Sequence, residues 1–335
     1  MNLLSIFDMS YILKNSKNDP IRAFRGISIH LKTKQKENMK DLSRRKFIRT
    51  GLVSFAGLAV AGPGLLKINF PAETTAVDKV KLGNSGLEVS RIALGTGSKG
   101  GSKASNQTRL GMEQFVKMAH HGYDRGVRFF DMADSYGSHQ YVGEAIKTLP
   151  REKVTLLTKI WTHEDGSDRN APVQESLDRY RQEMGTEYID IVLMHCLMSG
   201  GWSNNRKHYM DGLAKAKQDG IIKAVGVSCH NWDAMVEAVD NPWVDVIMAR
   251  INPFQSHMDN TPDVVKELLG KAKKNGIGVI GMKIFGEGRH VSDAEREQSF
   301  KFAITEGNTH CMTLGMESIA QVNDAVDRVM KIVKG

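Results

Sequence analysis

Cysteine is scarce in this chain, with only three copies among 335 residues. Cys196, Cys229 and Cys311 lie far apart, and none of them forms a CxxC pair. Their odd number and wide spacing argue against a disulfide framework and against a zinc site, so no metal site is predicted. We interpret all three as small buried apolar residues. They do not identify the redox compartment, because an oxidising compartment would not force them to pair.

Net charge is absent from most of the chain, although the total is +8. Residues 1–61 carry 12 Lys and Arg against 4 Asp and Glu, whereas residues 62–335 carry 34 of each kind. A nucleic-acid-binding protein is expected to keep a basic face in its folded part. We therefore predict no nucleic-acid partner for this protein.

Long hydrophobic runs are missing as well. The apolar stretch at residues 51–62 is shorter than the ~20 residues that a membrane-spanning helix needs. It follows the sequence Ser-Arg-Arg-Lys-Phe at residues 43–47, and Ala59-Val60-Ala61 fits a small-x-small cleavage site. The paired arginines and the order of these regions resemble a twin-arginine export signal.

This signal predicts how the chain is organised. Residues 1–38 are expected to lie upstream of a true start at Met39 or to be disordered. We expect residues 39–61 to be the signal peptide, 62–79 a linker and 80–335 the folded domain. The implied partner is the twin-arginine translocation machinery, and the implied location is periplasmic or exported in a bacterium, with no stable membrane span after cleavage. The alternative is a basic, disordered arm before a buried helix.

The sequence also lacks a GxGxxG motif after its first predicted strand, which argues against a Rossmann-type sheet. From Val80 onward, β-rich apolar runs alternate with helical patterns, as in a parallel βα fold. The turn Asn84-Ser85-Gly86 predicts a β-hairpin before the first of these units.

Eight strand–helix pairs follow the predicted hairpin. Strands are predicted at 91–97, 127–133, 154–160, 188–195, 222–228, 244–251, 278–284 and 310–315. Helices are predicted near 109–125, 139–149, 171–185, 207–219, 231–240, 261–275, 293–306 and 318–333. Eight such pairs in about 250 residues predict an α/β protein, a (β/α)8 TIM barrel with an N-terminal β-hairpin.

Four polar residues, Asp131, Tyr136, Lys159 and His195, stand at or just after the ends of three consecutive predicted strands. In a barrel, the carboxyl ends of the strands carry the active site. Taken singly, Asp131 also fits a turn cap, Tyr136 a packing residue and His195 a hydrogen-bonded core histidine. Lys159 is harder to explain by structure alone, because an unpaired ammonium inside an apolar strand is costly and requires a carboxylate.

Together the four residues predict carbonyl chemistry. A phenol with an ordinary pKa of about 10 donates protons poorly at neutral pH, and the Lys159 ammonium is expected to lower the pKa of Tyr136. Asp131 is expected to hold Lys159, while His195 orients a substrate carbonyl and donates a hydrogen bond to its oxygen. Since no side chain delivers a hydride, a nicotinamide cofactor is predicted at the barrel mouth.

The segments around these residues resemble the signatures of the aldo-keto reductase family. They read GVRFFDMADSYGSHQYVGEAIK, LLTKIW and IDIVLMHC, and their order and spacing match from Val80 to the C-terminus. The resemblance implies an NAD(P)-dependent oxidoreductase that acts on carbonyl or alcohol groups. It also implies a catalytic tetrad of Asp131, Tyr136, Lys159 and His195, with Tyr136 as the general acid.

The same resemblance implies a set of cofactor contacts. They fall at Gly97, Ser98, Ser228, Cys229, Met248, Met282, Lys283, Gly286, Gly315, Met316, Glu317, Ser318 and Gln321. Cys229 stands where the family often has Asn, and Met248 where Gln is frequent. Glu317 stands where Arg is usual, and its carboxylate would repel a 2′-phosphate. The expected cofactor is therefore NADP or NAD, without the family's usual preference for NADP.

The predicted substrate is a small carbonyl compound or a sugar, whose identity the sequence does not give. Pocket loops are expected at 98–108, 161–170, 197–206 and 285–292. Trp161 and Trp202 are expected to wall the pocket, with packing as the alternative. Arg250 and Arg289 are candidates for contact with an anionic substrate, with a solvated surface charge as the alternative.

Two other functions are open at this point. The first is a cofactor-binding redox sensor with little turnover, against which the intact tetrad argues. The second is a barrel lyase or hydrolase. That function would need a metal cluster or a carboxylate pair, and neither is found at the predicted strand ends.

Overall fold

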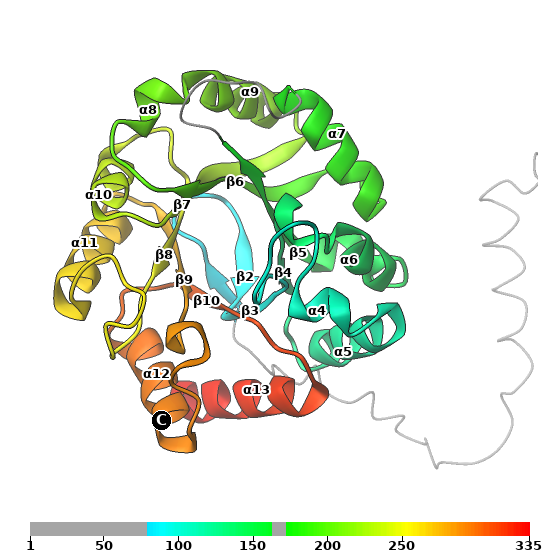
Figure 1. Ribbon diagram of the computed structural model, residues 1–335, viewed down its shortest axis with the longest axis vertical. Coiled ribbons are helices and arrows are strands. Elements are labelled where there is room, and N and C mark those ends of the chain that lie inside the picture. Colours follow the sequence, from blue (N-terminus) through cyan, green and yellow to red (C-terminus); the bar gives the residue numbers. More distant parts are fainter. Residues whose placement is uncertain (1–78, 163–171) are drawn as a thin grey trace, which may run out of the picture. The chain divides into compact units, whose positions relative to one another are not determined.

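A computed structural model of the protein describes residues 79–162 and 172–335. The predicted export signal and all but the last residue of the predicted linker therefore lie outside the described residues. The described part is a closed barrel of parallel strands surrounded by helices, as Figure 1 shows. The predicted α/β barrel is confirmed.

Eight parallel strands close the barrel in the order β10-β3-β4-β5-β6-β7-β8-β9. They are β3 (Ile92–Gly95), β4 (Phe129–Asp131), β5 (Thr155–Trp161), β6 (Ile189–Leu197), β7 (Ile222–Cys229), β8 (Val246–Arg250), β9 (Gly278–Met282) and β10 (Cys311–Leu314). Every strand falls where the apolar runs of the sequence predicted one. Since all strands run the same way, their carboxyl ends meet at one mouth of the barrel.

The predicted hairpin closes the opposite end of the barrel. Strands β1 (Lys79–Lys81) and β2 (Glu88–Ser90) pair antiparallel, with Val80 opposite Val89. The Leu82 amide donates to the Leu87 carbonyl at 2.9 Å across the predicted turn. Leu82 and Val89 are buried in the same apolar cluster as the barrel interior, which includes Phe129. The hairpin therefore forms an apolar floor beneath the strands.

Helices cover the outside of the barrel (Figure 1). They are α4 (Asn106–Arg109), α5 (Met112–Asp124), α6 (His139–Ile146), α7 (Val173–Met184), α8 (Trp202–Asn205), α9 (Lys207–Gln218), α10 (Trp232–Asp240), α11 (Pro262–Lys274), α12 (Asp293–Thr305) and α13 (Ile319–Lys334). The helix predicted near 109–125 is observed as α5, and the short helix α4, which Gly111 at φ 82° separates from α5, was not predicted. Among the described residues, no helix is long and apolar enough to cross a membrane.

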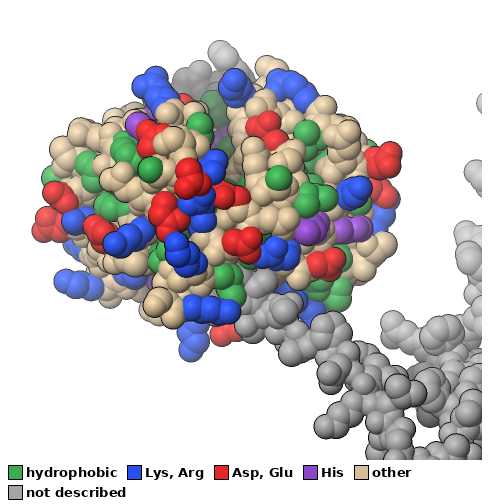
Figure 2. Space-filling view, turned by 90° about the horizontal axis from the view of Figure 1, so that it is seen from below, with side chains coloured by type: hydrophobic (Ala, Val, Ile, Leu, Met, Phe, Trp, Pro, Cys, Tyr) green, Lys and Arg blue, Asp and Glu red, His purple; other side chains and the backbone are tan. Residues whose placement is uncertain are grey.

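The structure also describes three short 3-10 helices, η2 (Asp134–Tyr136), η3 (Arg151–Lys153) and η4 (Gly286–Gly288). The first of them follows β4 directly and carries one of the predicted catalytic residues. At the surface, charges of both signs are interspersed on the face that Figure 2 presents. This mixture agrees with the neutral balance of the sequence after residue 61.

Candidate active site

The four predicted catalytic residues come together at the carboxyl ends of three neighbouring strands. Asp131 is the last residue of β4, Tyr136 ends η2, and Lys159 and His195 lie near the ends of β5 and β6. The phenol oxygen of Tyr136 lies 3.5 Å from His195 Nε2. Lys159 Nζ lies 5.0 Å from the centre of the Tyr136 ring. The structure thus places a phenol between an ammonium and an imidazole.

Lys159 is held as an ion pair inside the barrel. Its side chain is buried and forms a salt bridge with the buried Asp131 carboxylate. Lys159 Nζ also donates to the Met132 carbonyl at 2.8 Å, and Thr313 Oγ1 donates to Asp131 Oδ2 at 2.7 Å. Burial works to lower the pKa of Lys159, but Asp131 and Tyr136 together raise it above its ordinary value. The ammonium therefore stays charged at neutral pH.

Burial governs the ionisation of the other two groups. It raises the pKa of Tyr136 above 10.0, although Lys159 works in the opposite direction. The Lys159 ammonium works to lower the pKa of Tyr136 as expected, but desolvation of the phenolate outweighs it and the net shift is upward. Burial, Lys159 and His230 hold the pKa of His195 well below 6.5, so its imidazole is neutral at neutral pH.

Two glycines fix the position of the Tyr136 ring. A Cβ atom at Gly97 would collide with the ring, and one at Gly100 would lie 2.7 Å from ring atom Cδ1. The ring therefore packs directly on the backbone of the loop between β3 and α4. Gly97 was predicted as a cofactor contact, and its observed contact is with Tyr136. Gly100 was not predicted, because a glycine inside a Gly-rich loop carries no signal of its own.

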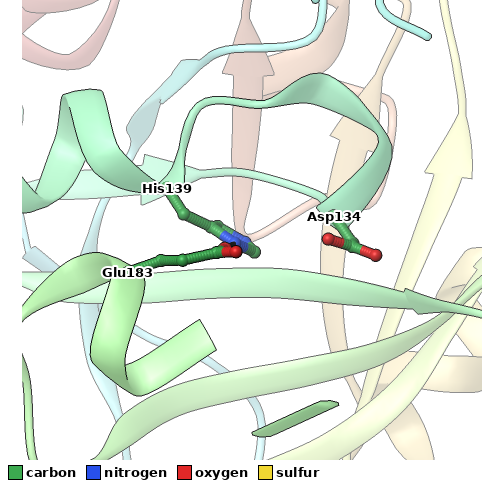
Figure 3. Close-up of side chains that lie close together, drawn as sticks. All are labelled: Asp134, His139 and Glu183. Carbon is green, nitrogen blue, oxygen red and sulfur yellow. Dashed lines mark hydrogen bonds and ion pairs between the residues drawn. The ribbon is translucent and has the colours of Figure 1, made fainter. Parts of the chain in front are cut away.

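A cluster of ligand-type side chains lies beside Tyr136, and Figure 3 shows Asp134, His139 and Glu183 pointing toward one another. One ligand atom of each residue lies within 4.8 Å of the others, a spacing that would suit a metal ion. Arg179 Nη1, however, donates to Asp134 Oδ1 at 2.8 Å and to Glu183 Oε1 at 2.9 Å. Both ring nitrogens of His139 are also engaged, by Glu183 and Thr158. Arg179 supplies the positive charge in this cluster, which is an ion-pair network.

Several predicted cofactor residues gather around one buried amide. Gln107 Oε1 accepts from the Ser98 amide at 3.0 Å, and its Nε2 donates to Ser98 Oγ at 2.9 Å and to the Met316 carbonyl at 3.3 Å. A Cβ atom at Gly315 would collide with Ser98 Oγ. The loops after β3 and β10 are thereby joined. Gln107 was missed by sequence reasoning, because nothing local marks it.

Glu317 is oriented by a second residue that sequence reasoning missed. Asn106 Nδ2 donates to Glu317 Oε1 at 2.8 Å, while the Glu317 amide donates to Gln321 Oε1 at 2.6 Å. Ser318 caps α13 by accepting from the Gln321 amide at 3.2 Å. Glu317, Ser318 and Gln321 therefore form one structured turn at the start of α13.

The predicted contacts on β7 to β9 divide into buried and loop residues. Cys229, Met248 and Met282 are buried, and both methionines belong to the barrel interior. Ser228 is also buried, and its hydroxyl has no hydrogen-bond partner among the described residues. A buried hydroxyl without a partner is costly, so a ligand with a polar group fits this position.

The loop after β9 is tied to the loop after β8. Lys283 Nζ pairs with Glu287 at 2.7 Å, and Glu287 also lies 3.3 Å from His257 Nδ1. Gly286 adopts φ 55°, and a Cβ atom there would lie 2.7 Å from Ser256 Cβ. Lys283 and Gly286 thus lie in a loop that packs against the loop after β8.

Of the two tryptophans predicted to wall the pocket, only Trp161 lies at the mouth. Its side chain is 40 % exposed and its ring centre lies 5.2 Å from that of His195. Trp202 is fully buried, and its Nε1 donates to the Ala234 carbonyl at 3.1 Å. The pocket role predicted for Trp202 is therefore wrong, because its ring packs in the core beside Trp243.

The two candidate anion-binding arginines also differ. Arg250 pairs with the carboxylate of Asp259, with Nε at 3.0 Å from Oδ2, and donates to the His230 carbonyl at 2.9 Å. Its charge is thus already neutralised, which contradicts a role in binding an anionic substrate. Arg289 is exposed, just after η4.

A parallel barrel with these residues at its mouth defines a class, the NAD(P)-dependent oxidoreductases that act on carbonyl or alcohol groups. The chain belongs to the aldo/keto reductase family, whose model matches residues 91–334. That match spans every barrel strand and leaves out the hairpin.

Named relatives resemble the chain at moderate identity. It is 26% identical over 259 residues to L-galactose dehydrogenase of Arabidopsis thaliana, a match that covers 72% of this chain and 77% of that protein. It is 27% identical over 219 residues to the NADH-specific methylglyoxal reductase of Escherichia coli, covering 60% of this chain and 65% of that protein.

Solved structures show the same fold. An aldo-keto reductase from Bacillus halodurans in its holo form matches with a TM-score of 0.60 and 19% identity, covering 76% of this chain and 91% of that one. An aldo/keto reductase from Klebsiella pneumoniae in complex with NADP and acetate matches with a TM-score of 0.58 and 17% identity, covering 76% and 90%. These likenesses concern the fold alone.

Proposed function

We propose that this protein interconverts a small carbonyl compound and the corresponding alcohol, with Tyr136 as the general acid in the reductive direction. The observation that carries the proposal is the convergence of Tyr136, Lys159 and His195, with the phenol oxygen 3.5 Å from His195 Nε2. A bound nicotinamide cofactor would supply the hydride. Ser228, near the end of β7, would hold one part of the cofactor. Ser98, in the loop after β3, and Glu317 and Gln321, at the start of α13, would hold another part.

Tyr136 is suited to hold a proton until a substrate needs it. Because burial keeps the pKa of Tyr136 above its ordinary value, the free phenol stays protonated at neutral pH. When the proton passes to a substrate oxygen, the phenolate that remains faces the Lys159 ammonium, which favours the charged form. Asp131 and the Met132 carbonyl keep Lys159 in place for that moment.

His195 has a different task in this scheme. Since its pKa is held well below 6.5, it can donate from only one ring nitrogen at neutral pH. A neutral imidazole beside Tyr136 would donate a hydrogen bond to the substrate oxygen without competing as the acid. Trp161, at the edge of His195, would contact the rest of the substrate.

The substrate class rests on two further arguments. Arg250 is paired with Asp259, so its charge gives no preference for an anionic substrate. The names of two relatives, L-galactose dehydrogenase and methylglyoxal reductase, refer to a sugar and to a small dicarbonyl. We therefore propose a small aldehyde, ketone or sugar, used with NADH or NADPH.

The experiment is a panel of aldehydes, ketones and sugars, with both reduced cofactors, on residues 62–335. Oxidation of cofactor that depends on the carbonyl compound, and that is lost in Tyr136→Phe, would support the proposal. Tight cofactor binding without turnover of any compound would contradict it and favour a redox sensor.

We also propose that residues 39–61 direct export by the twin-arginine pathway to the periplasm. The support is the sequence pattern alone, Arg44 and Arg45 before a short apolar stretch. Replacing both arginines by Lys keeps the charge but removes the guanidinium pair. The full-length precursor should then stay in the cytoplasm, and export of this variant would contradict the proposal.

A further inference from the structure

The turn that carries Tyr136 is fastened by a carboxylate that the chemistry above does not use. Asp134 begins η2, two residues before Tyr136. Arg179 Nη1 and Nη2 donate to its two oxygens at 2.8 and 3.0 Å, a bidentate contact from α7. Lys103 forms a salt bridge with the same carboxylate, at the oxygen that also accepts from Arg179 Nη1.

The Lys103 contact belongs to the loop that packs on the Tyr136 ring. In this loop, residues 97–104, the Lys103 amide donates to the Ser135 carbonyl at 2.9 Å. Gly97 and Gly100 of the same loop touch the Tyr136 ring. A backbone bond and an ion pair therefore join the loop to η2, directly beside the ring.

Arg179 is itself held in one orientation. Its Nη1 also donates to Glu183 Oε1 at 2.9 Å, and Glu183 Oε2 lies 2.7 Å from His139 Nδ1. His139 in turn contacts Thr158 Oγ1 at 2.7 Å, on the strand that carries Lys159. The chain of contacts thus runs from η2 through α7 and α6 back to β5.

We propose that Asp134 is a positioning residue, which holds the Tyr136 phenol at its reactive position by tying η2 to α7 through Arg179 and to the 97–104 loop through Lys103. This inference rests on the proposed function of Tyr136 as the acid. Asp134 itself touches neither the phenol oxygen nor His195 in any described contact. Its effect is on where the Tyr136 ring lies, and a displacement of about 1 Å at a reacting group can cost up to about 100-fold in rate.

The test compares Asp134→Asn with a matched variant, Asp190→Asn. Asp190 is also a carboxylate held by one Arg and one Lys, Arg151 at 2.8 Å and Lys223 at 2.8 Å. It is the second residue of β6 and therefore lies at the floor end of the barrel, opposite the mouth. Both variants lose one negative charge and weaken two ion pairs, so loss of stability alone affects both.

We expect Asp134→Asn to lower the single-turnover rate of carbonyl reduction by about 10- to 100-fold, with cofactor affinity changed by less than about twofold. Amide hydrogen exchange should become faster in residues 97–104 and 134–137. Asp190→Asn should change neither the single-turnover rate nor the amide hydrogen exchange of these two segments. Arg179→Lys, which keeps the charge but not the bidentate contact, should fall between Asp134→Asn and the unmodified enzyme.

Two results would overturn the proposal. One is unchanged exchange in residues 97–104 and 134–137 of Asp134→Asn, and the other is an equal loss of turnover in Asp190→Asn. The exchange measurement needs no turnover, so it judges the role of Asp134 separately. If the unmodified protein turns over no carbonyl compound while Asp134→Asn still loosens both segments, the proposed function fails and the structural link stands.

Discussion

Two buried carboxylates, one at each end of the barrel, are used in opposite ways. At the floor end, Asp190 accepts from the Leu156 amide at 2.9 Å and pairs with Arg151 and Lys223, whose side chains reach solvent. At the mouth, Asp131 pairs with Lys159, whose side chain is 2% exposed. The first carboxylate ties strands together, whereas the second keeps a charge inside the barrel.

The difference between the two ion pairs shows which buried charge requires a functional explanation. Without Asp190, Lys223 would still reach solvent and Arg151 would still donate to the Val154 and Tyr188 carbonyls, so their pairing needs no purpose beyond holding the strands. Lys159 would be left in an apolar interior without Asp131, and such a site is costly for stability. A costly charge beside a phenol and an imidazole is therefore best understood through the chemistry of the mouth.

The largest expected effect is on stability and contrasts these two carboxylates directly. Asp131→Asn leaves the Lys159 ammonium without its counter-charge, which should lower the free energy of unfolding by about 3–5 kcal/mol. Asp190→Asn should cost roughly 1–3 kcal/mol, because its cations can turn to water. Urea denaturation of both variants measures this. Equal losses would remove the distinction between the two ends.

The next effect concerns activity at the mouth. Tyr136→Phe removes only a hydroxyl, so carbonyl reduction should fall at least about 100-fold while the barrel stays folded and the cofactor still binds. Steady-state kinetics together with fluorescence titration of the cofactor provide the measurement. A matched control is Tyr188→Phe, since Tyr188 lies against Arg151 at the floor end. Near-normal turnover of Tyr136→Phe would refute Tyr136 as the acid.

A smaller effect concerns the choice of cofactor. Asn106 holds the Glu317 carboxylate where the family usually has a guanidinium, so we expect a preference for NADP over NAD weaker than about tenfold, or a reversal. Glu317→Arg should shift the preference toward NADP by roughly 1–3 kcal/mol, and Glu317→Gln should shift it less. Competitive binding of both reduced cofactors measures the difference.

A preference of several hundredfold for NADP in the unmodified protein would contradict this assignment. A basic residue elsewhere would then have to reach the 2′-phosphate. Arg109 would be the first to test, because its Nη1 donates to Asn106 Oδ1 at 3.1 Å beside Glu317.

The smallest expected effect is a change in the free energy of unfolding with pH in the acidic range. Burial works to raise the pKa of Asp134, but Arg179 and Lys103 lower it from 3.8 to about 2. The folded state therefore favours the ionised form, and this stabilisation is present above pH 3.8 and lost as the pH falls toward 2. The stability difference between the unmodified protein and Asp134→Asn should shrink over that range. A difference that grew on acidification would contradict the sign.

The sequence predicted the barrel well because the evidence for each strand is local. Apolar runs such as the one before His195 alternate with helical patterns, and a parallel barrel requires nothing more specific. The tetrad was predictable for a related reason: Lys159 inside an apolar strand demands a carboxylate, and Asp131 ends the preceding strand. Both inferences use only the position of a residue within its strand and the order of the strands, and the sequence gives both directly.

The rest depends on contacts between distant segments, which spacing does not reveal. Trp202 follows a loop and resembles a pocket residue in sequence, yet it contacts Ala234 and Trp243, which come much later in the chain. Arg250 resembles a free cation in the sequence, but in the structure it forms a salt bridge with Asp259. The net rise in the pKa of Tyr136 was equally hidden, because its largest cause is burial, to which Asp131 and Cys196 add.

The apolar floor has a practical consequence for anyone who wishes to shorten the protein. The family match begins at residue 91, which invites a cut just before β3. Such a cut would delete Val89 and Leu82, whose side chains are almost completely buried beneath the strands. The open end of the barrel would then expose Phe129 and its apolar neighbours to water. A version that begins before Lys79 keeps this seal, and should stay soluble where the shorter one aggregates.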